Sequence, residues 1–287
     1  MKNRAWLFLA PALFLVSLSA FIPLMTVINY SLHLLYPGSI PEFYGLENYV
    51  ELFQDEIFLT SIKTQFMFTF QVLIIEIPLG LLVALAMPSR GKWLTLTLVL
   101  LGIPLLIPYP IVGMVWRVFT RADLGVVPWF MAKLSYDYRP VEHAIDAWVT
   151  TVVMDVWHWV PLVALLCFAG LQTIPEPFYQ AARIDGASRW ATFRMVTLPK
   201  LRYVLILAVL LRATDSFKIW AEVYNLTGGG PGSTTNFMSL YTSSQAIGGA
   251  DLGYGSALSM VYLYIVVILC YLLYMVMMNV GQGGAQK

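Results

Sequence analysis

The feature that most constrains this chain is a series of long apolar stretches. A helix needs about 20 apolar residues to cross a bilayer, and six segments approach or exceed that length. We expect membrane-spanning helices at about 5–35, 66–87, 93–119, 147–171, 203–224 and 255–279. The third contains Pro104, Pro108 and Pro110. Prolines interrupt backbone hydrogen bonds, so this helix is expected to be kinked or partly unwound.

The composition excludes an ordinary soluble enzyme. Charged residues make up 11% of the 287 residues and hydrophobic residues 59%, whereas a soluble domain carries about a quarter charged residues. Cys167 and Cys270, the two cysteines, lie in apolar runs, so a disulfide framework is not expected. No basic stretch is interleaved with aromatic residues, which argues against a nucleic-acid partner. The expected surroundings are membrane lipid.

The distribution of lysine and arginine predicts the orientation. If the N-terminus is cytoplasmic, the inside segments contain ten basic residues and the outside loops three. The inside group consists of Lys2, Arg4, Arg90, Lys92, Arg183, Arg189, Arg194, Lys200, Arg202 and Lys287. Cytoplasmic loops carry an excess of such residues, so we expect both termini to be cytoplasmic.

The spans divide the chain into three expected parts. Residues 1–60 form a leading transmembrane helix and an acidic extracytoplasmic loop, 61–280 a core with a cytoplasmic loop at 174–202, and 281–287 a cytoplasmic tail. The acidic loop contains Glu42, Glu47, Glu51, Asp55 and Glu56. It is compatible with a solvated amphipathic cap or with a docking edge for an external partner.

The loop at 174–202 has the pattern of a helix, a tight turn and a second helix. Pro175 and Pro177 suit the start of a helix, with Thr173 as its cap. Gly186 follows an aspartate and marks a turn, because glycine tolerates a positive φ. An interfacial helix anchored by arginines would explain the charges but neither the alanine pair at 181–182 nor the turn. A surface received by another protein explains both better.

Two runs of sequence resemble a known family. QAARIDGASRWATFRMVTLP at 180–199 resembles the coupling loop of ABC importer permeases, in which EAA, a short gap, DGA and LP follow at fixed spacing. It departs at Gln180, where glutamate is usual, and at Tyr203, where a proline often follows. RATDSFKIWAEVYNLTGGGPGSTTNFMSLY at 212–241, followed by LGYGSALS, is similar to the fifth span and next outside loop of carbohydrate permeases of the maltose and glycerol-phosphate type.

The resemblance implies an all-α membrane protein with the type I ABC importer fold, in the bacterial cytoplasmic (inner) membrane. The implied partners are a second homologous permease, two cytoplasmic ABC ATPase subunits, an extracytoplasmic solute-binding protein and a sugar-like solute. The implied ATPase-coupling residues are Gln180, Ala181, Ala182, Arg183, Asp185, Gly186, Ala187, Leu198 and Pro199. In particular, Gly186 would set the turn and the alanines would form the contact face.

ATP hydrolysis is expected in another chain. The glycine cluster at 228–232 lacks the lysine of a phosphate-binding loop. ATP and Mg²⁺ would bind the partner ATPase subunits, and this chain is expected to be a transport subunit, not an enzyme, without a cofactor or catalytic residue of its own.

Ionisable residues within a span are costly and usually face the bundle interior or a water-filled path. On the fifth span, four charged residues lie within an arc of about 120°: Arg212, Asp215, Lys218 and Glu222, with Asn225 beside them. Their alternating charges would either pair and fix this helix to its neighbours or bind the hydroxyl groups of a solute. Trp220 lies on nearly the opposite face.

Two further positions are candidates for the substrate pathway. Asp155, His158 and Trp159 share a face of the fourth span, where a carboxylate beside an aromatic ring suits a sugar. They are equally compatible with an interfacial cluster near the outer headgroups, and they are too few for a metal site. Glu76, just before Pro78, would either bond to backbone groups freed near the proline or line the path.

Two other classes of function remain as alternatives. One is an ion-coupled secondary transporter that uses the charged fifth helix, and the other is a membrane enzyme that uses Asp155 and His158. A secondary carrier has no ATPase to dock, and such carriers are usually larger or internally duplicated. The cytoplasmic loop therefore favours the importer. The resemblance of the fifth span and its outside loop implies that the solute is a saccharide, a related polyol or a glycerol phosphoester.

Overall fold

The computed structural model describes the backbone of residues 5–285 and the side chains of residues 9–278. It is almost entirely helical, which confirms the expected all-α class. The chain divides into two compact units. The first unit contains Met1–Thr60 and Met238–Val267, and the second unit contains Ser61–Phe237 and Ile268–Lys287.

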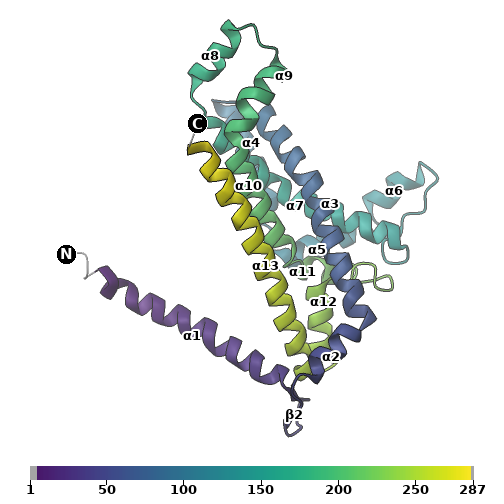
Figure 1. Cartoon of the computed structure of the whole chain (residues 1–287). Coiled ribbons are helices and arrows are strands. Elements are labelled where there is room, and N and C mark those ends of the chain that lie inside the picture. The colour runs from purple at the N-terminus through teal and green to yellow at the C-terminus, as the bar shows by residue number, and fades with distance from the viewer. Residues whose placement is uncertain (1–4, 286–287) are drawn as a thin grey trace. The chain divides into compact units, whose positions relative to one another are not determined.

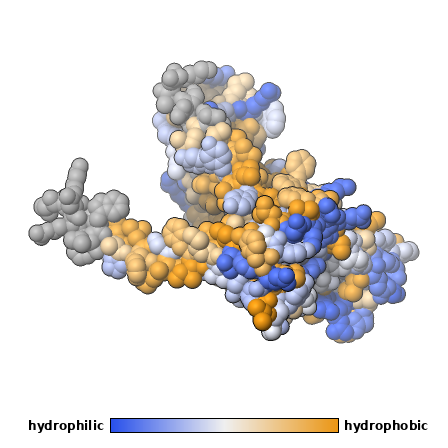
Figure 2. Space-filling view, turned by 60° about the horizontal axis from the view of Figure 1, so that its bottom comes forward, coloured by the Kyte–Doolittle hydropathy of each residue, from blue (hydrophilic) through white to orange (hydrophobic). Residues whose placement is uncertain are grey.

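The first unit begins with α1 (Ala5–Ser31), a long apolar helix. The most apolar 18-residue stretch between Leu9 and Ser31 contains no buried residue. The described part of this helix shows a mostly hydrophobic surface (Figure 2). Such a surface suits contact with lipid. α1 leads into an antiparallel pair of short strands, β1 (His33–Leu34) and β2 (Glu42–Phe43), followed by α2 (Glu47–Gln54).

Later parts of the chain complete the first unit. These are α12 (Met238–Ser243), a π-helical turn (Ser244–Gly248) and the first part of α13 (Leu252–Ala285). A side chain at Gly253 would collide with the carbonyl of His33, so glycine permits the close approach of α13 to β1. Asn48 closes the same region, because its amide donates to the carbonyls of Ser31 (3.0 Å) and His33 (3.1 Å).

Asp55 connects the start of α3 (Glu56–Ala86) to α12 and α13. Its carboxylate accepts hydrogen bonds from the hydroxyls of Tyr241 and Tyr254 and from the backbone N–H groups of Ile57 (2.8 Å) and Phe58 (3.3 Å). Burial alone would raise the pKa of this carboxyl, but the hydrogen bonds to its charged form outweigh burial and hold the pKa below its ordinary value. Burial and the Asp55 carboxylate raise the pKa of Tyr241 to about 12.

The second unit is a helical bundle. Its long helices are the rest of α3, α4 (Lys92–Leu106), α5 (Tyr109–Phe119), α7 (Ala144–Gln172), α10 (Leu198–Ser216) and the rest of α13. Its short helices are α6 (Val126–Ala132), α8 (Glu176–Ile184), α9 (Arg189–Thr192) and α11 (Ala221–Leu226). α3, α7 and α10 run beside one another, and α8 and α9 project beyond one end of them (Figure 1).

Small residues allow the helices of this bundle to pack closely. A Cβ atom at Gly80 of α3 would lie 2.6 Å from Val163 of α7, and one at Gly170 of α7 would lie 2.8 Å from Leu201 of α10. Ala84, Val163, Cys167 and Ala208 form a buried cluster between these helices. Close approach through small residues is typical of helices in a membrane.

The expected third span is bent, as its prolines predict. α4 and α5 meet at an angle of 95° across a break of a few residues. Residues 107–108 separate them, and Pro108 precedes the first turn of α5. Pro104 and Pro108 therefore divide one apolar stretch into two helices.

The prediction that the fifth span is a single helix from 203 to 224 is wrong. α10 ends at Ser216, and α11 begins at Ala221. In a continuing helix the carbonyl of Ser216 would accept from the N–H of Trp220. Instead, Gln65 of α3 donates its side-chain amide to that carbonyl at 3.0 Å.

Among the described residues, four helices are long and apolar enough to cross a membrane, or five if α4 and α5 form one span. Six spans and two cytoplasmic termini therefore stay predictions. Lys2, Arg4 and Lys287, which support the orientation, lie outside the described residues. α13 continues to Ala285, so this helix includes most of the tail expected at 281–287. Residues 286–287 lie outside the described part of the chain.

Candidate functional site

The loop between α7 and α10 forms the helix–turn–helix that its sequence predicts. α8 starts after Pro175, whose extended backbone leads into the first turn. Thr173 does not cap this helix, contrary to expectation. It ends α7, and its hydroxyl donates to the carbonyl of Gly170 at 2.8 Å. The start of α8 therefore depends on Pro175 and Pro177 without a side-chain cap.

Gly186 produces the turn after α8. Its φ is +70°, a conformation that L-residues with a side chain rarely adopt. The N–H of Ala187 donates to the carbonyl of Ala182 (2.9 Å) and that of Gly186 to Arg183 (3.1 Å), which is the hydrogen-bond pattern of a Schellman motif. No heavy atom lies within 4 Å of a Cβ built at Gly186. The turn therefore needs glycine for its backbone conformation and not for space.

The two faces of α8 have different surroundings. Ala182 is buried, which corrects the expectation that both alanines form a contact face. Gln180 and Ile184 are exposed on the opposite side, with Ala181 exposed next to them, and Ile184 is 85% exposed. Arg183, Asp185, Gly186 and Ala187 are exposed as well. An exposed apolar isoleucine on a polar loop is a surface that gains from contact with a partner.

Leu198 and Pro199 have a different position from the other implied coupling residues. They form the first turn of α10, directly after the π-helical turn Phe193–Thr197. Proline is favourable in a first helical turn, where its missing N–H breaks no hydrogen bond. These two residues fix where the loop returns to the bundle.

A second candidate site lies inside the bundle around Arg212 of α10. Its guanidinium binds both carboxylate oxygens of Glu76 on α3, at 2.7 and 3.1 Å. It also binds Asp155 of α7 at 2.7 Å and Asp215 of α10 at 3.3 Å. Arg212 and Glu76 are fully buried. One arginine thus joins three helices through three carboxylates, which we name the Arg212 network.

Aromatic rings border the Arg212 network. The guanidinium carbon of Arg212 lies 4.4 Å from the ring centre of Trp159, a cation–π distance. Trp159 packs edge-to-face against His158 at 5.0 Å, and Tyr109 of α5 lies 6.1 Å from Trp159. His158 is buried, Trp159 is half-buried and Tyr109 is exposed. The rings and carboxylates offer stacking surfaces and hydrogen-bond acceptors side by side.

The remaining pathway candidates are not on one stripe of one helix, because α10 is interrupted. Lys218 lies in the break, its side chain is 69% exposed, and it reaches Asp215 at 3.4 Å. Glu222 and Asn225 lie on α11, which packs against α5. A side chain at Gly113 of α5 would collide with the carbonyl of Glu222.

The sequence did not indicate Arg212 as the centre of the charged residues, because its partners lie on other helices. It also did not associate Tyr109 with Trp159. Within the part of the chain whose side chains are described, no three His, Cys, Asp or Glu side chains are arranged to hold a metal ion.

Comparisons with known proteins extend over most of the chain. A family model described as the binding-protein-dependent transport system inner membrane component matches residues 76–281. The trehalose/maltose transport system permease protein MalF of Thermococcus litoralis is 36% identical, over 88% of this chain and 86% of that protein. The sulfoquinovosyl glycerol transport system permease protein SmoG of Agrobacterium fabrum is 33% identical, over 90% of this chain and 84% of that protein.

Solved structures share the fold. A chain of a bacterial ABC transporter involved in the import of the acidic polysaccharide alginate matches with a TM-score of 0.82 and 19% identity, over 96% of both chains. The alginate transporter in complex with alginate pentasaccharide-bound periplasmic protein gives a TM-score of 0.79, also at 19% identity, over 94% of this chain and 93% of that chain. The match confirms the expected fold over nearly the whole length.

Proposed function

The chain belongs to the family of binding-protein-dependent transport system inner membrane components, and we propose that it couples to a cytoplasmic ATPase through α8 and the Gly186 turn. It is a multi-pass inner-membrane protein and a transport subunit, not an enzyme. The proposed assembly contains a second homologous permease, two ABC ATPase subunits that bind ATP and Mg²⁺, and an extracytoplasmic solute-binding protein. The complex of the alginate transporter with a periplasmic protein supports the last partner.

The observation that carries the coupling proposal is the exposed face of α8. Gln180, Ala181 and Ile184 project from a short rigid helix that a Schellman motif closes. Ala181 is small enough to permit close contact with a neighbouring backbone, and Ile184 would bury its exposed side chain. Closure of the ATPase pair would then move α8 as one body, and Leu198–Pro199 would transmit that motion to α10.

A series of substitutions at Gly186 tests this proposal. A residue with a side chain pays about 1–2 kcal/mol in the left-handed region, whereas asparagine tolerates it better. We expect solute uptake to fall in the order Gly186→Asn, Gly186→Ala, Gly186→Val, with Gly186→Val abolishing it, at unchanged amounts of chain in the membrane. Gly91→Val is the matched control, because Gly91 also has a positive φ (+87°) and open space around it. Normal uptake by Gly186→Val, or equal loss in Gly91→Val, would contradict the proposal.

We propose a carbohydrate or a related polyol or sugar derivative as the solute. The names of MalF and SmoG and the alginate transporter support a saccharide, as do the aromatic rings beside carboxylates. The fully buried Glu76 and Asp155 would hold the pathway helices together, whereas the partly exposed Trp159, Asp215 and Lys218 would meet the solute. His158, Glu222 and Asn225 would support these groups from α7 and α11.

A pair of alanine variants tests which side of the break faces the solute. Asp215 accepts from Arg212 and Lys218, whereas Trp220 stacks on Tyr224 at 5.2 Å. We expect Asp215→Ala to reduce uptake of a labelled saccharide more than Trp220→Ala does. Equal effects at equal protein levels would remove the reason for placing the charged residues on the pathway.

A further inference from the structure

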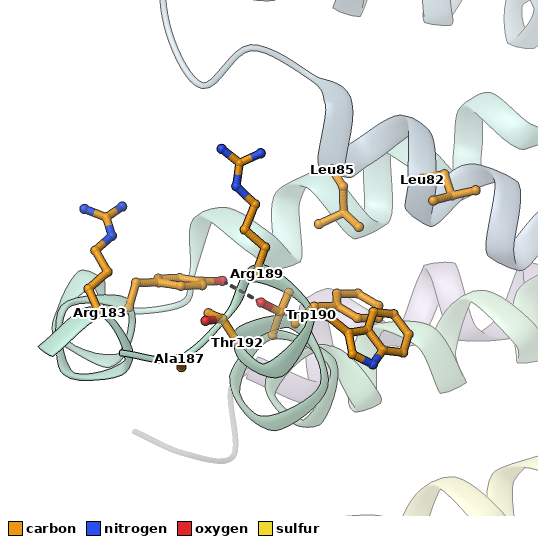
Figure 3. Close-up of a pocket in the computed structure, with 10 residues that line it drawn as sticks. Leu82, Leu85, Arg183, Ala187, Arg189, Trp190 and Thr192 are labelled. Carbon is orange, nitrogen blue, oxygen red and sulfur yellow. Dashed lines mark hydrogen bonds between the residues drawn. The ribbon is translucent and has the colours of Figure 1, made fainter. Parts of the chain in front are cut away.

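A groove of about 830 Å³ lies between the end of α3 and the α8–α9 loop (Figure 3). Its apolar wall consists of Leu82 and Leu85 of α3 with Trp190 and Phe193 of the loop. Trp190 and Phe193 stack at 5.5 Å, and Trp190 is 68% exposed. The groove therefore presents a large apolar surface that nothing in this chain covers within the described residues.

The charge of the groove is positive. Arg183 and Arg189 line it, and no aspartate or glutamate does. Figure 3 shows both guanidinium groups extending from the loop toward the same side. Among the described residues neither arginine forms an ion pair, and the remaining polar lining consists of Tyr179, Thr192 and Thr197. Guanidinium groups bind phosphate through several N–H donors, so this side of the groove suits an anionic headgroup.

The apolar wall belongs to a membrane-spanning helix. Leu82 and Leu85 lie in the last turns of α3, which is long and apolar enough to cross the bilayer, and both side chains are exposed. The groove thus extends from the hydrocarbon edge of α3 to the basic loop. Trp190 borders the apolar wall, and tryptophan is typical of the headgroup depth. A free anion would leave the apolar wall empty, and a zwitterionic lipid would not balance two arginines.

We propose that this groove binds an anionic phospholipid from the adjacent leaflet, with an acyl chain along Leu82 and Leu85 and the phosphate at Arg183 and Arg189. The groove shares Arg183 and Ala187 with the residues implied for ATPase coupling, but it lies on the side of α8 away from Ala181 and Ile184. Tyr179 and Arg183 line the groove, whereas Ala181 and Ile184 project from the other side of α8 at about 100° per residue. One bound lipid would tie the α8–α9 loop to the end of α3.

Quenching of Trp190 tests the site. The full-length chain is purified in detergent micelles and titrated with phosphatidylglycerol or phosphatidylcholine that carry the same brominated acyl chains. The Trp190 signal is the difference between the chain and its Trp190→Phe variant. We expect phosphatidylglycerol to quench Trp190 at lower concentration than phosphatidylcholine does. An arginine near an anionic lipid is worth about a factor of five in binding, so Arg183→Gln with Arg189→Gln should raise the half-saturating concentration about 25-fold.

Arg194→Gln is the matched control, because Arg194 is exposed on the same loop but does not line the groove. It should leave the half-saturating concentration unchanged. Equal quenching by the two lipids would overturn the proposal, as would complete competition by soluble glycerol phosphate, which would indicate a free-phosphate site. Loss of quenching when the ATPase subunits are bound would assign the groove to a protein interface and would overturn it as well.

Discussion

Replacing Arg212 by methionine should destabilise the second unit more than any exposed substitution. The apolar side chain would leave the carboxylates of Glu76 and Asp155 buried without the guanidinium that binds them at 2.7 Å. Removing one partner of a buried ion pair costs about 3–5 kcal/mol, because the remaining charge stays unpaired. At roughly 2–4 °C per kcal/mol, the midpoint of thermal unfolding in mild detergent should fall by about 10 °C.

Two further variants separate charge from geometry. Arg212→Lys keeps the charge but not the planar group that binds two carboxylates at once, so its midpoint should lie between those of Arg212→Met and the unchanged chain. Adding Glu76→Gln and Asp155→Asn to Arg212→Met removes the unpaired charges and should recover more than half of the loss.

Lys218→Met is the matched control for this series. Lys218 also pairs with Asp215, but its side chain is 69% exposed, and surface ion pairs contribute about 0–1 kcal/mol. Its effect on the midpoint should therefore be small. If Arg212→Met unfolds no earlier than Lys218→Met, or if the two added substitutions recover nothing, then the Arg212 network does not hold the three helices together.

Two other predictions concern packing and pH. Gly113→Val should reduce the stability of the chain by about 1–3 kcal/mol, because the valine side chain would collide with the carbonyl of Glu222. Gly102→Val is the control, because Gly102 has open space around it and should not show this packing penalty. Unfolding of the two purified variants in detergent, compared at equal purity, measures the difference in stability. The charged Asp55 stabilises the first unit above about pH 4, the ordinary pKa of an aspartate, and this stability is lost as the pH falls through its lower folded-state pKa. The hydrogen-exchange protection of residues 47–60, taken relative to the intrinsic exchange rate at each pH, should therefore fall in acid, and Asp55→Asn should remove most of that dependence; an unchanged profile in Asp55→Asn would show that another group controls it.

The sequence predicted the features that depend on neighbouring residues. Gly186 adopts the positive φ that a glycine after an aspartate indicates, and Pro175 begins α8 where expected. Pro104 and Pro108 divide the third apolar stretch in the same way. Each of these residues restricts its own backbone, so the information is local and readable without a structure.

The features that the sequence did not reveal depend on distant contacts. The break after Ser216 has no proline or glycine to mark it, and its carbonyl is bound by Gln65, which lies 151 residues earlier. Arg212 finds Glu76 and Asp155 on two other helices. The burial of Ala182 likewise depends on how α8 packs, and no spacing along the chain encodes it.

The most direct test of coupling through α8 is purification of the tagged chain in mild detergent from the membrane in which it normally functions, followed by identification of the co-purifying proteins by mass spectrometry. We expect an ABC ATPase subunit and a second homologous permease in stoichiometric amounts, and loss of the ATPase subunit when Gly186 is replaced by valine. A chain that purifies without an ATPase subunit, in a preparation that moves saccharide on an ion gradient alone, would contradict coupling through α8 and favour a secondary transporter.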